Sequence, residues 1–296
     1  MVRCLFILLL FMSHGFALEH YERFVKEYVE NETLFITTRR FELQGVTFYL
    51  TINTQTLQTK VLALDASRLQ PLSSRFDATP FAKLLSTATA HPESGGVTHA
   101  QTKLPKAIFL TMDMCPSTKK GYENAFLAHL TQTNGKTPIA IAMSSAWMEH
   151  HPKEFQELIN HPLLEITWVN HTHTHFYDRS LEERQNFMLH QPTNVQQEVF
   201  GLEQKLLEQG LTPSVFFRFP GLVSDAKLMK ELKETYFLVP LSTDAWIAKG
   251  QKVKEGSILL IHGNKNEPQG IEALEKELPK LLKTFTFKPL REAFAL

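Results

Sequence analysis

The sequence has few cysteines, no excess of charge of either sign and no hydrophobic run long enough to cross a bilayer. Two cysteines among 296 residues exclude a disulfide-stapled scaffold and a cysteine-rich zinc module. Basic and acidic residues number 31 each, which leaves no electrostatic footprint for nucleic acid or for an anionic membrane surface. A hydrophobic content of 43% excludes wholesale disorder. We therefore expect a globular protein with no nucleic-acid partner and no membrane span.

The first 17 residues have the three zones of a secretory signal peptide. Arg3 forms a short basic region, and residues 5–12 are an apolar run. Gly15 and Ala17 then put small residues at the −3 and −1 positions of a cleavage site. We predict cleavage after Ala17 and an exported protein, periplasmic or secreted.

Cleavage at this point changes the cysteine count. The mature chain begins at Leu18 and loses Cys4, which lies too early to be a lipid-anchored cysteine. Cys115 is then the single cysteine of the predicted mature chain, so an intramolecular disulfide is excluded.

Residues 18–104 are predicted to be a β-rich region followed by a linker. Residues 19–31 have a helical pattern. Three stretches within residues 34–63 are rich in Thr, Val, Phe and Tyr with partial alternation, which is typical of strands. Residues 66–104 are polar and poorly patterned, so we expect a loop or linker there.

From residue 105 to 296 the pattern changes to alternating strands and helices. The runs of strand length are AIFLTMD, TPIAIAM, LLEITWVN, SVFFRFP, FLVPLST, SILLIH and FTFKPL. Helical segments at residues 119–131, 152–160, 195–209, 225–235 and 271–283 separate them. This alternation predicts an α/β domain with a parallel sheet or barrel, whose ligands lie at the carboxyl ends of the strands.

Histidine is plentiful, with 13 residues, and several stand where those strands end. Five successive strand ends each carry a charged, imidazole or indole group: Asp113; His171, His173 and His175; Arg218; Asp244 and Trp246; and His262. One such residue would mean little, but the whole series is typical of a functional site.

The segment NHTHTH has the spacing of a metal site. Histidines at i and i+4 share one face where the chain is helical or tightly turned, so His171 and His175 can bind one Zn²⁺ at about 2.1 Å. His173 points elsewhere, toward the substrate or toward groups behind the ligands. The other interpretation of this segment is a chance cluster of solvent-exposed histidines.

Taken in order, the motifs resemble those of the polysaccharide deacetylases, the NodB-homology domain of carbohydrate esterase family four. LTMDMCP stands where that family has T-F-D-D-G-P, NHTHTH matches N-H-[ST]-x-x-H, and FRFPG matches R-x-P-[YG]. STDAW is similar to the D-x-x-D-W region with a shorter spacing, and ILLIH matches L-x-H. The resemblance covers residues 107–294.

The resemblance implies a distorted (β/α) barrel that removes acetyl groups from an N-acetylated polysaccharide, a cell-wall or peptidoglycan-type glycan, with a metal-activated water. Asp113 takes the place of the general base and His262 that of the general acid. Arg218 is expected to hold the Asp113 carboxylate. Asp244 is expected either to orient His262 or to pair with Arg218.

The resemblance also implies a place for the substrate. Trp246 and Leu260 are expected to form an apolar seat for the acetyl methyl group. A backbone N–H near Gly221 is expected to help stabilise the oxyanion, and His173 is a further candidate for substrate contact.

The sequence departs from the family at the metal site. Met114 replaces the aspartate that is the family's third ligand, and Cys115 replaces the following glycine. A thioether is a poor ligand for a borderline cation, whereas a thiolate suits Zn²⁺. Three arrangements stay open: Cys115 completes the site of His171 and His175; Asp113 binds the metal itself; or the metal is lost and the protein only binds glycans.

We expect Zn²⁺ at this site, or another divalent transition metal such as Co²⁺, Ni²⁺ or Mn²⁺. A metal-dependent amidase that acts on a non-sugar acyl amide would present the same residues, because loops rather than strand ends set the substrate.

Overall fold

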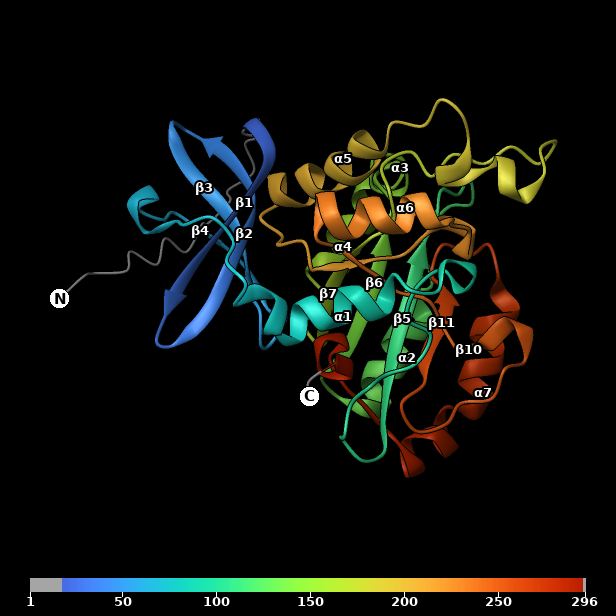
Figure 1. Cartoon of the computed structure of the whole chain (residues 1–296). Coiled ribbons are helices and arrows are strands. Elements are labelled where there is room, and N and C mark those ends of the chain that lie inside the picture. The colour runs from blue at the N-terminus through green and yellow to red at the C-terminus, as the bar shows by residue number, and fades with distance from the viewer. Residues whose placement is uncertain (1–17, 295–296) are drawn as a thin grey trace.

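The structure, a computed structural model, describes residues 18–294, and the predicted signal peptide lies outside the described residues. Two sheets dominate it: a four-stranded antiparallel sheet near the N-terminus and an eight-stranded, curled parallel sheet with helices around it (Figure 1). The predicted α/β class, a distorted barrel with a small N-terminal β-rich extension, is confirmed. Among the described residues, no helix has the length and apolar character needed to cross a membrane.

The N-terminal sheet has the order β1-β2-β3-β4. Its strands are β1 (Glu19–Glu30), β2 (Thr33–Leu43), β3 (Val46–Asn53) and β4 (Thr59–Leu62). The helix predicted at residues 19–31 is wrong, because this stretch pairs with β2 along its length and Tyr28 stacks on Phe35 at 5.1 Å between ring centroids. Two register shifts interrupt the β1–β2 ladder and break the strict alternation that would have marked a strand.

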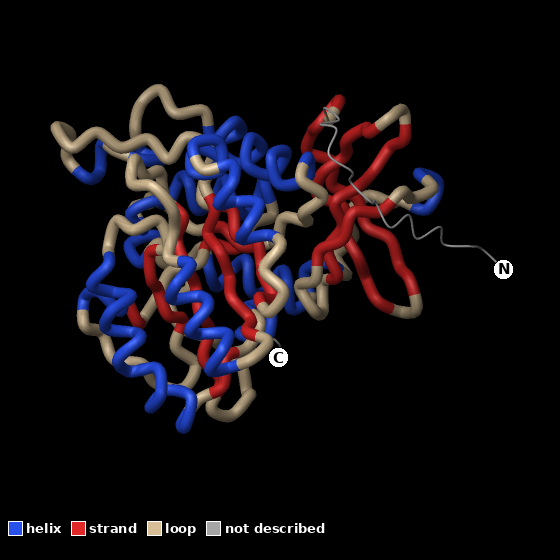
Figure 2. The backbone as a smooth tube through the Cα atoms, turned by 180° about the vertical axis from the view of Figure 1, so that it is seen from behind, coloured by secondary structure: helices blue, strands red, loops and turns tan. Residues whose placement is uncertain are grey.

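The parallel sheet has the order β10-β11-β5-β6-β7-β8-β9, with β12 paired to β5. Its strands are β5 (Ala107–Met114), β6 (Thr137–Met143), β7 (Leu164–Asn170), β8 (Phe216–Phe217), β9 (Val239–Pro240), β10 (Ala245–Trp246), β11 (Ile258–His262) and β12 (Thr286–Phe287). The helices are α2 (Asn124–Asn134), α3 (Ser145–His150), α4 (Pro152–Ile159), α5 (Val195–Glu208), α6 (Ala226–Glu231) and α7 (Pro268–Thr284). Seen from behind, helices lie over the parallel strands while the N-terminal sheet stands to one side (Figure 2).

Strand β5 is buried along its whole length, which shows that both faces of the parallel sheet are covered. Ile108, Leu110 and Met112 pack outward into a core shared with α2 and α7. Ala107 and Phe109 point to the inner face, where they meet α1 (Pro80–Ala88) and the C-terminal turn. The same alternation carries Thr111 and Asp113 to the inner face.

The segment 66–104 is more than the predicted loop or linker. It contains α1 (Pro80–Ala88), whose Thr79 cap accepts a hydrogen bond from the backbone N–H of Ala82. Phe81 and Leu85 of this helix are buried in the inner core of the barrel. This helix has only nine residues and lies within polar sequence, so its helical pattern of apolar residues is too short to be recognised from the sequence.

A buried ion pair joins the N-terminal sheet to helix α5 of the barrel. Arg39 of β2 donates to both carboxylate oxygens of Glu203 on α5, at 2.7 and 2.9 Å, and the two side chains are 1% and 2% exposed. Tyr21 donates a third hydrogen bond to this carboxylate, and the Arg39 guanidinium lies 4.8 Å from the ring centroid of Phe200. The pair fixes the N-terminal sheet against the barrel.

Replacing Arg39 with Met leaves the Glu203 carboxylate buried without its counter-charge. We expect the free energy of unfolding to fall by about 3 to 5 kcal/mol, measured by urea denaturation. The matched control is Arg40→Met, which breaks the exposed pair with Glu22 on the same sheet and should cost about 1 kcal/mol or less. Equal losses for the two variants would contradict the structural role of the buried pair.

Candidate active site

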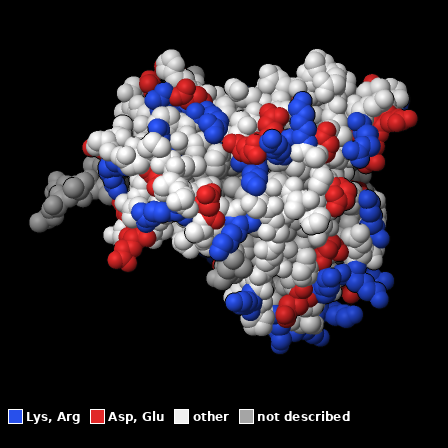
Figure 3. Space-filling model, in the orientation of Figure 1, with Lys and Arg blue, Asp and Glu red and all other residues white. Residues whose placement is uncertain are grey.

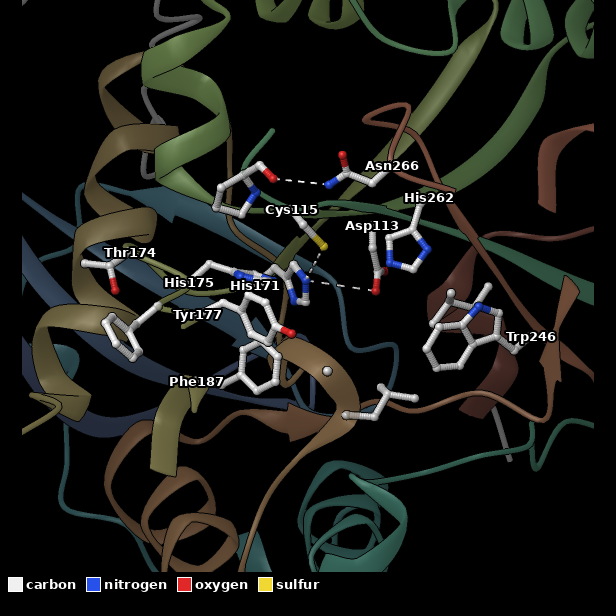
Figure 4. Close-up of a pocket in the computed structure, with 15 residues that line it drawn as sticks. Asp113, Cys115, His171, Thr174, His175, Tyr177, Phe187, Trp246, His262 and Asn266 are labelled. Atoms are coloured by element: carbon white, nitrogen blue, oxygen red, sulfur yellow. Dashed lines mark hydrogen bonds and ion pairs between the residues drawn. The ribbon is translucent and has the colours of Figure 1, made fainter. Parts of the chain in front are cut away.

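The carboxyl ends of the parallel strands open into a cavity of about 540 Å³ (Figure 4). Eight of the predicted site residues line it: Asp113, Cys115, His171, His175, Gly221, Trp246, Leu260 and His262. Arg218 lies directly behind the cavity, and two further predicted residues, Asp244 and His173, lie elsewhere.

Asp113 ends β5 and is 4% exposed. The fully buried Arg218 donates to its Oδ1 at 3.2 Å, and also to the Thr111 hydroxyl at 3.0 Å and the Ser242 carbonyl at 3.2 Å. Burial alone would raise the pKa of Asp113, but the guanidinium and the nearby histidines outweigh burial and hold the pKa below its usual value. The cavity therefore has an ionised carboxylate in its wall, held from behind as predicted.

Cys115, His171 and His175 bring one possible ligand atom each to within 4.8 Å of the others. The Cys115 Sγ lies 3.5 Å from His171 Nε2. His171 Nδ1 lies 2.8 Å from the Arg218 carbonyl oxygen, so this nitrogen carries the proton and leaves the Nε2 lone pair free to face the cavity. Among the described residues, the buried Nε2 of His175 has no hydrogen-bond partner. This donor set fits a metal ion.

The protonation states of these groups also suit a metal. Burial raises the pKa of the Cys115 thiol, but the neighbouring His175 and His262 imidazoles outweigh burial and lower that pKa to about 7. Burial lowers the pKa of His171, and the attraction of Asp113 offsets this only in part. Thiolate and neutral imidazole are the forms that bind a metal.

The turn that carries the histidines is irregular rather than helical. Thr172 and His175 both have positive φ angles, of 75° and 49°. Glu198 of α5 stabilises the turn, because its carboxylate accepts from the Thr174 backbone N–H at 2.9 Å and from the Thr174 hydroxyl at 2.6 Å. Backbone strain of this kind persists only where surrounding contacts hold it.

His173 does not reach the substrate side. Its ring packs on Gly201 of α5 so closely that a Cβ at position 201 would lie 2.7 Å from the His173 Cγ. The structure does not support the predicted substrate contact, because the His173 ring faces α5 and not the cavity, which His171 and His175 line.

Asp244 takes neither of its two predicted roles. It lies 2.7 Å from His99 Nδ1 and accepts from the Ile258 backbone N–H at 3.0 Å. Ile258 begins β11 and His262 ends it, so Asp244 stands about 13 Å along the strand from the imidazole it was expected to orient. The shortened spacing of STDAW places this carboxylate at the wrong end of the strand.

Glu267, which the sequence analysis missed, holds His262 instead. Its Oε2 lies 2.7 Å from His262 Nδ1 and accepts from the Trp246 indole N–H at 3.0 Å. Burial lowers the pKa of His262, but the neighbouring Cys115 thiol and Glu267 carboxylate outweigh burial and raise it to about 10. The signal was present in the sequence, since Glu267 directly precedes the first residue of α7 and follows His262 by five positions.

Trp246 and Leu260 line the cavity beside His262, as the predicted acyl seat requires. The Trp246 ring centroid lies 5.9 Å from that of His262. Gly221 also lines the cavity, with a φ of 63°, and a Cβ there would lie 2.4 Å from a Phe187 ring carbon. Only glycine satisfies both the backbone angle and this close approach.

An aromatic wall completes the cavity and was also missed. Phe176, Tyr177 and Phe187 come from the long segment that follows NHTHTH, which projects beyond α5 in Figure 1. Tyr177 is 61% exposed and stacks on Phe187 at 5.4 Å between ring centroids. An exposed aromatic face at the rim of a cavity suits a ligand with flat apolar surfaces.

Solved structures with the same fold are family 4 carbohydrate esterases. One, from Bacillus anthracis, is 19% identical to this chain with a TM-score of 0.51, and the match covers 72% of this chain and 90% of that one. Another, PdaA from Bacillus subtilis, is 16% identical with a TM-score of 0.51, and the match covers 72% of this chain and 87% of that one. No protein-family model matches the chain.

The matches extend over most of each esterase. At this level of sequence identity, the matches show a shared fold and do not assign chemical roles to individual residues. The predicted resemblance is thus confirmed at the level of structure: this chain has the fold of the family 4 carbohydrate esterases, the polysaccharide deacetylases.

Proposed function

We propose that the protein is a metal-dependent hydrolase that removes N-acetyl groups from a polysaccharide, such as a cell-wall or peptidoglycan-type glycan. The observation that carries the proposal is the convergence of Cys115, His171 and His175 on one point of a cavity that also holds Asp113 and His262. A metal site flanked by an acid and a base is what hydrolysis of an amide needs.

The geometry favours Cys115 over Asp113 as the third ligand. The Cys115 Sγ belongs to the group of possible ligand atoms that lie within 4.8 Å of one another, whereas Asp113 is not in that group and its carboxylate is paired with Arg218. Met114 is fully buried in the outer core and takes no part. A His₂Cys set suits Zn²⁺ well, and Zn²⁺ lowers the pKa of bound water and polarises a carbonyl.

The chain's own residues supply the proton transfers. Asp113 accepts the proton of the attacking water, and Arg218 keeps that carboxylate ionised and aimed into the cavity. His262 donates a proton to the departing amine nitrogen as the C–N bond breaks.

The cavity walls suit an N-acetyl sugar. Trp246 and Leu260 offer an apolar seat to the acetyl methyl group, and the exposed Tyr177 face offers a surface to the apolar face of a pyranose ring. On the face drawn in Figure 3, basic and acidic side chains are interspersed, which suits a substrate without strong charge. Export by the predicted signal peptide would bring the protein to such a glycan.

A second candidate is a glycan-binding protein without catalysis on the same fold. The observation that favours it is Met114, which stands where the family has a metal-binding aspartate. The two candidates differ in a single measurable product, acetate.

The mature protein, loaded with Zn²⁺, should release acetate from an N-acetylated cell-wall glycan, and a chelator should abolish the release. Asp113→Asn should lower the rate by about 100-fold or more, because the water loses its proton acceptor. Acetate is measured by an enzyme-coupled assay, with chelated and zinc-restored samples as controls. Binding of the glycan without acetate release would overturn the hydrolase and favour the second candidate.

Metal content tests the ligand set separately from activity. His171→Ala, His175→Ala and Cys115→Ser should each weaken Zn²⁺ binding by more than roughly tenfold, measured by elemental analysis after dialysis. The bound metal should also protect the Cys115 thiol of the native protein from alkylation.

The matched control for the metal measurement is His173→Ala. This histidine belongs to the same NHTHTH segment but packs on α5, so the variant should keep its zinc. Unchanged zinc in all three ligand variants, or loss of zinc in the control, would contradict the assignment.

A further inference from the structure

We propose that Glu267 is the positioning residue for His262 and that it has the orienting role that was one of the two expected for Asp244. The inference rests on the proposed function, because it gives His262 its part in amide cleavage. Nothing in the five motifs contains Glu267, and the residue lies beyond the last of them, at the start of α7.

The geometry around the imidazole is specific. Glu267 Oε2 lies 2.7 Å from His262 Nδ1, and the two side chains are 16% and 19% exposed. The opposite ring nitrogen, Nε2, is then left for the cavity, which His262 lines. A carboxylate bound to one nitrogen fixes both the tautomer and the direction of the other.

The same carboxylate oxygen also fixes a wall of the cavity. It accepts from the Trp246 indole N–H at 3.0 Å, and the Lys249 ammonium lies 3.5 Å from the Trp246 ring centroid. One group therefore sets the spacing between the proton donor and the predicted acyl seat, in a site where small displacements matter.

The neighbouring carboxylates are already engaged. Asp113 is held by Arg218, and Asp244 is held by His99 and the Ile258 backbone at the far end of β11. Glu267 is thus the carboxylate that reaches the Nδ1 side of His262 in residues 18–294.

The step in question is cleavage of the amide C–N bond. The electron pair of that bond moves to the nitrogen, and the nitrogen takes the Nε2 proton of His262. The product leaves as a neutral amine. The proton on Nδ1 stays on the ring, bonded to Glu267. An amine cannot leave as an anion, whereas an aryl oxide can leave without a proton. Positioning of the donor should therefore matter for an amide and hardly at all for an aryl ester.

The test compares the two leaving groups. In the zinc-loaded protein, Glu267→Gln and Glu267→Ala should lower the turnover number for an N-acetylated chito-oligosaccharide by about 10- to 100-fold. Hydrolysis of 4-nitrophenyl acetate by the same samples should change by less than about threefold. Glu267→Asp should recover part of the amide activity, and zinc content should stay at the wild-type level in all three variants.

The matched control is Asp244→Asn. Its ratio of amide to ester hydrolysis should equal that of the wild type, because Asp244 does not touch His262. A selective loss of amide hydrolysis in this variant would assign the role to Asp244 and overturn the proposal. An equal fall on both substrates in the Glu267 variants would show a structural role only, and would also overturn it.

A second measurement does not depend on activity. The Nδ1 proton of His262, assigned by its loss in His262→Gln, should appear as a protected imidazole N–H in the NMR spectrum of the wild type and of Asp244→Asn. It should be lost in Glu267→Ala, and its persistence there would contradict the proposal. A wild-type protein that cleaves neither substrate would contradict the proposed function, and this role with it.

Discussion

The in-register parallel pairing of β5 with β11 is the constraint on which the site depends. It sets His262 directly beside Asp113, on neighbouring strands about 4.8 Å apart. The ladder continues through β6 and β7 to Asn170, which pairs with Phe217 and so brings Arg218 and the histidine turn to the same edge. A slip of one residue in any of these pairings would turn Asp113 or Arg218 to the opposite face.

Arg218 adds a second constraint, because its guanidinium is fully buried. A buried charge persists only when it is paired and hydrogen-bonded, and Asp113, Thr111 and the Ser242 carbonyl accept from the two terminal nitrogens of Arg218, whereas its Nε has no hydrogen-bond partner among the described residues. The carboxylate of the proposed base is therefore also required for the stability of the barrel interior. Its orientation is set by the fold before any substrate binds.

The sequence predicts well which functional residues lie at the ends of the strands. The apolar strand runs and the residues that close them, Asp113, Arg218 and His262, are found where the alternation of strands and helices places them. The same reasoning finds the His171 and His175 pair, because their spacing survives in a tight turn as it would in a helix. These features depend on local pattern, which a single sequence carries.

The errors come from longer-range geometry. Asp244 is only two residues from Trp246 in sequence, but the strand register puts it at the opposite end of β11 from His262. Glu267 precedes the first residue of α7, so a search for functional residues at the ends of strands does not find it. Residues 19–31 look helical in isolation and become a strand because β2 lies beside them. In each case a tertiary partner decides the outcome.

In the proposed function, Cys115 supplies the third metal ligand, because Met114 stands where the polysaccharide deacetylases have an aspartate. X-ray absorption spectroscopy at the zinc edge of the loaded protein tests this most directly. We predict one sulfur scatterer at about 2.3 Å together with two imidazole nitrogens at about 2.0 to 2.1 Å. A zinc shell of nitrogen and oxygen alone, with no sulfur, would contradict it.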